Sequence, residues 1–136
     1  MLPKTKKQEK KHRKKKRDLE ISMVAEELDN LVPKRKKGIL TILEFGCGDG
    51  FQIPVLEKFG DVTAMDVYLS KEVSKMPDVN FIQASITTTL FGNGKFDIIF
   101  SNHVLEHLQR LKKTFKELKR IGKKNCIYLP FQQEYG

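Results

Sequence analysis

The sequence has no tryptophan, only two cysteines and no long apolar run among its 136 residues. A membrane-spanning helix needs about 20 apolar residues in succession, and a secretory signal needs an apolar core that the basic N-terminus lacks. We therefore expect a soluble, cytoplasmic protein. No Cys-x-x-Cys pair is present, which argues against structural zinc, so Cys47 and Cys126 are expected to be free thiols.

Positive charge is concentrated at the N-terminus. Residues 4–17 contain ten Lys or Arg and one Glu, a net charge of +9 that equals the charge of the whole chain and leaves 16 basic and 16 acidic residues elsewhere. Like charges without apolar neighbours repel one another, so residues 1–17 are expected to form a disordered or transiently helical arm. Two interpretations of Lys4–Arg17 remain open. The segment is merely solvated, or it binds one of three partners: RNA without sequence specificity, an anionic membrane surface, or the nuclear-import machinery.

Residues 18–136 are expected to form one domain that begins with an amphipathic helix. Ile21, Val24, Leu28 and Leu31 recur at helical spacing over Asp18–Leu31 and would dock on a sheet. The basic loop 34–38 then separates this helix from the first strand.

The first strand ends in three glycines at alternate positions. Residues 42–45 are largely apolar, and Gly46, Gly48 and Gly50 follow, so the backbone can turn tightly and approach a ligand. Residues 51–59 suggest a helix that ends before Gly60, which gives the first half of a nucleotide-binding βαβ unit. A dinucleotide site would have glycine at position 51; Phe51 there argues against a nicotinamide oxidoreductase.

Further motifs follow in a fixed order. The run 62–66 ends in Asp66, residues 79–86 would provide a third strand and turn, and residues 94–108 combine a Phe-Asp run with a Leu-Glu-His-Leu segment. Together with Glu44-x-Gly46-x-Gly48-x-Gly50, these motifs resemble the class I S-adenosylmethionine-dependent methyltransferases (the Methyltransf_11 type). The resemblance covers roughly residues 39–130.

The resemblance implies a Rossmann-like three-layer αβα sandwich around a mainly parallel sheet of order 3-2-1-4-5. The strand at residues 125–129 is the last one that the sequence provides, so the family's final strands are lacking. Either the chain is a fragment, or a partner chain or second copy covers the exposed edge of the fifth strand.

The function implied is methyl transfer from S-adenosylmethionine to an O or N nucleophile, with a small-molecule acceptor favoured slightly over RNA. The alternative is a truncated or non-catalytic cofactor-binding domain that acts through protein or RNA interaction. The resemblance assigns cofactor contacts to Glu44 and the backbone of Gly46, Cys47 and Gly48 at the methionine end, Asp66 at the ribose, Val67 and Ile86 around the adenine, Ser85 at the adenine edge, and Asn102 near the methyl group. Ser85 departs from the family's usual Asp.

Three interpretations remain open for the histidines that follow Asn102. They are structural, or His103 or His107 accepts a proton from the acceptor, since imidazole titrates near neutral pH. In the third, His103, Glu106 and His107 hold a metal, as in a similar Glu-x-x-Glu-His site of some O-methyltransferases. A single helix after Asn102 is expected, with Val104, Leu108, Leu111, Phe115 and Leu118 on its buried side.

Overall fold

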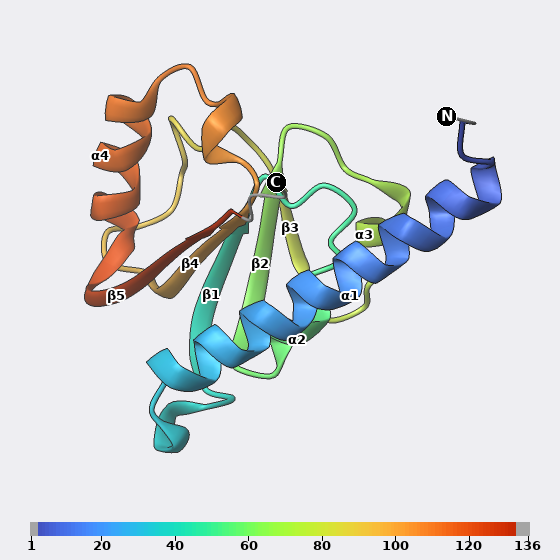
Figure 1. The fold of residues 1–136 in the computed structure, drawn as a ribbon. Coiled ribbons are helices and arrows are strands. Elements are labelled where there is room, and N and C mark those ends of the chain that lie inside the picture. The colour runs from blue at the N-terminus through green and yellow to red at the C-terminus, as the bar shows by residue number, and fades with distance from the viewer. Residues whose placement is uncertain (1–2, 133–136) are drawn as a thin grey trace.

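One parallel sheet organises the molecule. The computed structural model describes residues 3–132, and its strands lie in the order β3-β2-β1-β4-β5 (Figure 1). Their bounds are Leu40–Phe45 for β1, Gly60–Asp66 for β2, Asn80–Gln83 for β3, Phe96–Asn102 for β4 and Gly122–Phe131 for β5. The predicted fold class and strand order are confirmed.

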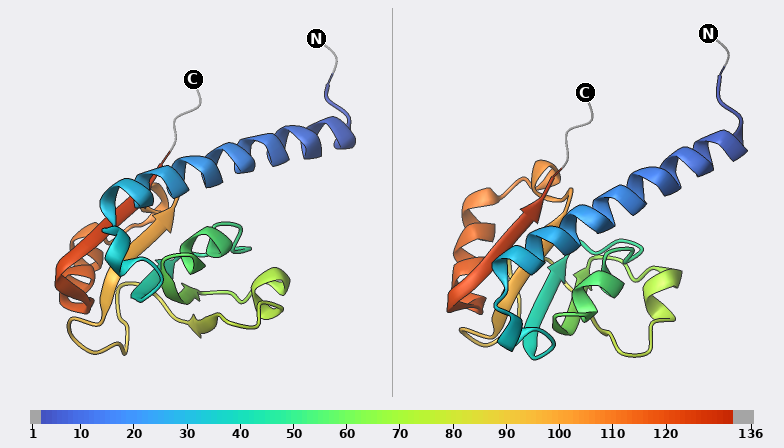
Figure 2. Two further views of the ribbon diagram at one scale, coloured as in Figure 1. Left: turned by 90° about the horizontal axis from the view of Figure 1, so that it is seen from below. Right: turned by 60° about the horizontal axis from the view of Figure 1, so that its bottom comes forward.

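Helices cover both faces of this sheet. The long helix α1 (Lys6–Leu31) and the short α2 (Ile53–Glu57) lie on one face, and α4 (Leu111–Ile121) covers the other (Figure 2). Alternation along β1 explains the two cores, because Ile42 packs with Val24 and Leu28 of α1 while Leu43 packs with Ile121 of α4. Short helices α3 (Lys71–Ser74), η1 (Lys34–Lys36) and η2 (Leu105–His107) complete the described chain.

Gly60 begins β2 directly opposite Leu40 of β1. A Cβ built on Gly60 would collide with the backbone carbonyl oxygen of Leu40. Glycine is therefore required here by the close approach of two strands, and not by the helix end that the sequence suggested.

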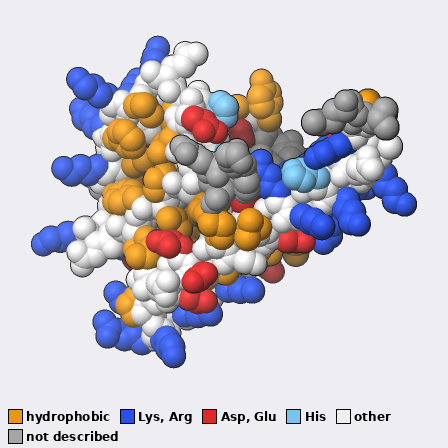
Figure 3. Space-filling view, in the orientation of Figure 1, with side chains coloured by type: hydrophobic (Ala, Val, Ile, Leu, Met, Phe, Trp, Pro, Cys, Tyr) orange, Lys and Arg blue, Asp and Glu red, His pale blue; other side chains and the backbone are white. Residues whose placement is uncertain are grey.

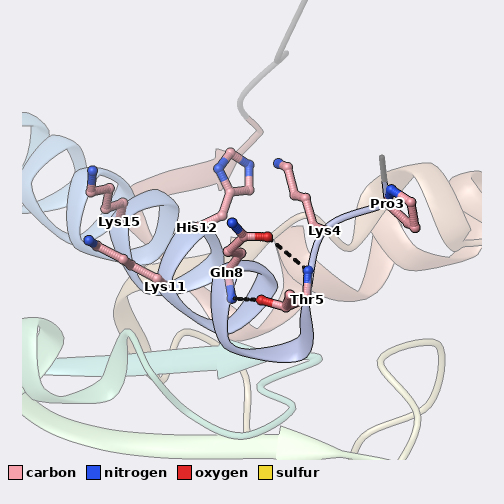
Figure 4. A pocket seen from close by; sticks show the side chains of 7 residues that line it. All are labelled: Pro3, Lys4, Thr5, Gln8, Lys11, His12 and Lys15. Atoms are coloured by element: carbon pink, nitrogen blue, oxygen red, sulfur yellow. Dashed lines mark hydrogen bonds between the residues drawn. The ribbon is translucent and has the colours of Figure 1, made fainter. Parts of the chain in front are cut away.

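The structure differs from the expected disordered or transiently helical arm, because α1 is one continuous helix from Lys6. Thr5 and Gln8 cap its start reciprocally: Gln8 N donates to Thr5 Oγ1 at 3.1 Å and Thr5 N donates to Gln8 Oε1 at 2.9 Å (Figure 4). Lys and Arg are also good helix formers, so mutual repulsion does not prevent the helix. Within the part predicted to be helical, Val24 and Leu28 are buried as expected but Leu31 is exposed.

The chain after Asn102 also differs from the prediction. The single expected helix is divided into η2 and α4, with residues 108–110 between them. This break resets the helical phase, so α4 buries Thr114, Leu118 and Ile121 and leaves Leu111 and Phe115 exposed. Helix α2 is shorter than residues 51–59, and β5 is longer than residues 125–129. Within residues 3–132 we find no helix with the length and apolarity that a bilayer crossing requires.

Candidate functional site at the glycine turn

The glycine turn follows β1, between the ends of β2 and β4. This is the point where the strand order of the sheet reverses, and open parallel sheets bind ligands there. Gly46 and Gly48 have positive φ angles of 66° and 55°, which residues with a Cβ rarely adopt. A Cβ on Gly46 would also lie 2.7 Å from the Val104 side chain, whereas one on Gly48 would have open space around it.

Asp66 holds this turn against β2. The backbone N–H of Gly48 donates to Asp66 Oδ2 at 2.8 Å, and that of Val67 donates to Asp66 Oδ1 at 2.7 Å. Cys47 N also donates to the Met65 carbonyl at 3.1 Å. A carboxylate has about four acceptor positions, so Asp66 keeps acceptor capacity after fixing the turn.

Glu44 lies behind the turn and is 2% exposed. Its Oε1 has no hydrogen-bond partner among the described residues. Burial, reinforced by the nearby charges of Asp49 and Asp66, raises the pKa of Glu44 to about 8. A buried acceptor without a partner is costly, so a ligand that supplies a donor here is favoured. Because the carboxyl groups of Glu44, Asp49 and Asp66 lie close together, the favoured donor is a cationic group.

A cavity of about 270 Å³ opens in front of these groups. Its lining residues come from α1, the end of β1, the glycine turn with the residue after it, and the end of β4: Arg17, Glu44, Gly46, Cys47, Gly48, Asp49, Phe51 and Asn102. The structure thus brings together the predicted residues of the methionine end. Asp66 joins them through its bond to Gly48.

Arg17 is a lining residue that sequence reasoning missed. Its Nη1 lies 2.7 Å from Asp49 Oδ2, and its guanidinium lies 4.5 Å from the centre of the Phe51 ring. Arg17 precedes Ile21, Val24 and Leu28 at helical spacing, so its place on the inner face of α1 was visible in the pattern. The sequence analysis nevertheless left Arg17 out, because residues 1–17 were expected to be disordered or only transiently helical.

Asn102 ends β4 at the rim of the cavity. Gln52 Nε2 donates to Asn102 Oδ1 at 3.4 Å, while Gln52 Oε1 is buried without a partner among the residues described. Asn102 therefore belongs to a polar pair, and it does not cap a helix directly after β4.

His103 pairs with Glu20, a second residue that the sequence analysis missed. His103 Nε2 lies 2.6 Å from Glu20 Oε1, and Glu20 is 3% exposed. His103 has a φ of 56°, the sole positive value at a non-glycine residue in 3–132, and such strain often accompanies functional sites. Glu20 lies four residues before Val24, so its buried position was a signal in the helical pattern.

The residues assigned to the adenine are less closely assembled. Val67 follows Asp66 and is half exposed, while Ile86 is buried in the core on the α4 side. Ser85 is exposed, and its Oγ lies 2.9 Å from Thr87 Oγ1 and accepts from Thr87 N at 3.3 Å. Its hydroxyl therefore supports a local turn.

His107 is not among the lining residues of the cavity; its side chain is 77% exposed and its Nε2 lies 3.4 Å from Glu106 Oε1. With His103 turned to Glu20, the structure does not bring His103, Glu106 and His107 together. In the described range no group of three His, Cys, Asp or Glu side chains is placed to hold a metal ion.

Both cysteines are free, as predicted. Burial, with the charges of Glu44 and Asp66, raises the pKa of Cys47 to about 12. Only the thiolate is nucleophilic, so iodoacetamide at pH 7.5 should alkylate Cys47 roughly a thousandfold more slowly than an ordinary thiol. Peptide mass spectrometry over time measures this, with denatured protein as the fully reactive control; alkylation of native Cys47 at the denatured rate would contradict it.

Solved structures with the same fold support the topology. The YcgJ protein of Bacillus subtilis superposes with a TM-score of 0.69 at 17% identity, over 80% of this chain and 48% of that one. An S-adenosylmethionine-dependent methyltransferase from Aquifex aeolicus gives 0.62 at 24% identity, over 73% and 58%. A complex of the Trm112 methyltransferase activator with a methyltransferase candidate from Haloferax volcanii gives 0.62 at 17%, over 68% and 44%.

This chain therefore spans about half the length of those structures. A search of curated protein sequences gives no match. Residues 43–129, more than half of the chain, match the family model described as "Methyltransferase domain". This domain binds S-adenosylmethionine, which confirms the predicted cofactor. The chain belongs to the methyltransferase domain family.

Proposed function

We propose that this chain transfers a methyl group from S-adenosylmethionine to an O or N nucleophile of an acceptor. The observation that carries the proposal is the buried, unpartnered Oε1 of Glu44 behind the glycine turn. The ammonium group of an amino-acid cofactor is a donor of the right charge for this atom. The open space beside Gly48 leaves room for such a ligand against the main chain.

The proposed cofactor contacts follow from this placement. Glu44 and the backbone of Gly46, Cys47 and Gly48 bind the methionine end, and Asp66 accepts from the ribose hydroxyls while it anchors the turn. Val67, Ser85 and Ile86 contact the adenine. Asn102, oriented by Gln52, lies at the side where the acceptor enters. When bound, S-adenosylmethionine supplies an electrophilic methyl group, so alignment is the main task of the protein.

His103 is our candidate for the proton acceptor. It directly follows Asn102, and Glu20 holds its Nε2, which leaves Nδ1 to receive a proton from the acceptor nucleophile. Glu20 is then a positioning residue. His107 is not included, because its side chain faces solvent.

Calorimetric titration with S-adenosylmethionine and with NAD tests the proposal. We expect heat of binding with a one-to-one stoichiometry for S-adenosylmethionine and none for NAD, because Phe51 occupies the position where a dinucleotide site has its third glycine. Binding of NAD alone would overturn the proposal. A domain that only holds the cofactor would bind it yet form no S-adenosylhomocysteine with any acceptor.

A protein partner is a second proposal for the free edge of the sheet. β5 pairs with β4 on one side and is the last strand of the described sheet, and such an edge can pair with another chain. The Haloferax volcanii complex shows a methyltransferase candidate of this fold with a protein activator. Light scattering measures whether the chain associates; a strictly monomeric, well-folded chain would contradict this proposal.

A further inference from the structure

The N-terminal half of α1 projects from the body of the molecule (Figures 1 and 2). The residues 4–16 are exposed, and residues 4–17 carry a net charge of +9. In the space-filling view, Lys and Arg side chains line this projecting part (Figure 3). Residues 6–17 extend for roughly 18 Å at the rise of an α-helix.

A groove runs along this part of α1 toward the glycine turn. Its volume is about 670 Å³, and its lining consists of six basic residues together with one acidic and two apolar ones: Lys7, Lys10, Lys11, Arg13, Lys14, Arg17, Asp18, Ile21 and Phe51. The four lysines are spaced at i, i+3, i+4 and i+7, so they share one face of the helix. We call the groove lined by these lysines, Arg17 and Phe51 the basic groove.

The basic groove leads to the cofactor cavity. Arg17 and Phe51 line both hollows, and the Arg17 guanidinium lies over the Phe51 ring. A chain of phosphates bound along the lysines would therefore arrive beside the cavity mouth. Aromatic and guanidinium surfaces are those on which nucleobases stack.

The composition of the helix indicates whether its anionic partner is a nucleic acid or a membrane surface. Residues 4–17 contain no apolar side chain, whereas a helix that lies in a membrane interface needs an apolar face to insert. Lysines at regular spacing along an exposed helix match the repeating charge of a phosphodiester backbone. The charge pattern thus favours a nucleic acid over a lipid surface.

We propose that the basic groove binds the phosphate backbone of a nucleic acid and holds it beside the cofactor cavity. The contacts are electrostatic and independent of base sequence. This inference goes beyond the proposed methyl transfer and does not depend on it.

The test compares two variants that remove the same charge from different helices. One changes Lys7, Lys10, Lys11 and Lys14 to Gln; the control changes Lys112, Lys113, Lys116 and Lys119, which are exposed on one face of α4, to Gln. Gln and Lys have similar helix propensities, so both helices should persist, and circular dichroism verifies this. A third variant with Arg at the four groove positions keeps the charge.

Fluorescence anisotropy with a labelled single-stranded RNA, an RNA hairpin and a DNA duplex measures binding from 50 to 200 mM salt. We expect the groove variant to bind at least about tenfold more weakly than wild type at the lowest salt, with the slope of log K against log salt reduced by roughly 3 to 4 on a duplex. The α4 control and the Arg variant should bind like wild type. The probe with the highest affinity identifies the form of nucleic acid.

Three results would overturn the proposal: no binding of any of the probes, an equal loss in the α4 control, or tighter groove-dependent binding to phosphatidylserine vesicles than to any nucleic acid. Titration of the same variants with S-adenosylmethionine keeps this question separate from the proposed function. Unchanged cofactor affinity together with lost nucleic-acid binding supports the groove, while intact nucleic-acid binding without cofactor binding rejects only the methyl transfer.

Discussion

Replacing Asp66 by alanine should weaken S-adenosylmethionine binding by about 2 to 3 kcal/mol, or roughly 30- to 150-fold. Two losses add up in this variant. The ribose hydroxyls lose a charged acceptor, and the backbone N–H groups of Gly48 and Val67 lose the carboxylate that fixes the turn. Isothermal calorimetry on wild type and variant gives the difference directly.

Asp61→Ala is the matched control, because Asp61 is an exposed carboxylate near the start of the same strand β2. It should leave the affinity unchanged. A cofactor analogue that lacks both ribose hydroxyls separates the two losses. If Asp66→Ala binds this analogue more weakly than wild type does, the difference comes from the turn alone. Equal affinity of wild type and Asp66→Ala for S-adenosylmethionine would contradict the ribose assignment.

Cofactor affinity should rise about tenfold between pH 6 and pH 7. With a pKa of about 8, Glu44 is protonated in the free protein over this range, and a bound ammonium group favours its carboxylate form. Binding therefore releases a proton, and the affinity for the cofactor increases as the pH rises. Calorimetry in buffers of different ionisation enthalpy counts the protons released.

Glu44→Gln is the control for this effect, because it preserves the shape of the side chain and removes its titration. The variant should bind more weakly at pH 7 and show no Glu44-dependent proton release. A wild-type affinity that stays constant from pH 6 to pH 7, with no proton released, would show that Glu44 does not meet the ammonium group.

The same raised pKa affects folding. The folded chain keeps the Glu44 proton up to about pH 8, whereas an unfolded chain loses it near the ordinary glutamate pKa of 4.5. The folded state therefore binds more protons between these values, and its stability falls as the pH rises through this window. A cation bound in the cavity offsets that loss, because it stabilises the charged carboxylate.

The sheet and the glycine turn could be predicted because their signals are local. An apolar run followed by alternating glycines, and a second run ending in Asp66, each specify a strand and its end within a few residues. The strand order then followed from the family resemblance. The pairing of Asp66 with the Gly48 N–H could not be predicted in the same way, since 18 residues separate the two.

Contacts between distant residues explain the errors as well. The helical state of residues 6–17 is supported at its C-terminal end by Arg17, which binds the distant Asp49, whereas the Thr5 and Gln8 cap at its start is a local signal that the sequence analysis did not use. The chain after Asn102 does not continue directly into a helix, because His103 there has a φ of 56° and its side chain pairs with the distant Glu20. Charge and periodicity within a short window contain no information on such pairs.

The crowding of Gly60 against the Leu40 carbonyl has a consequence for comparing this chain with its relatives. Any homologue that keeps these two strands at this separation is confined to glycine at the corresponding position, whichever molecule it methylates. An invariant glycine at this position would reflect the architecture of the sheet. The position should therefore be left out when glycines are used to infer cofactor preference.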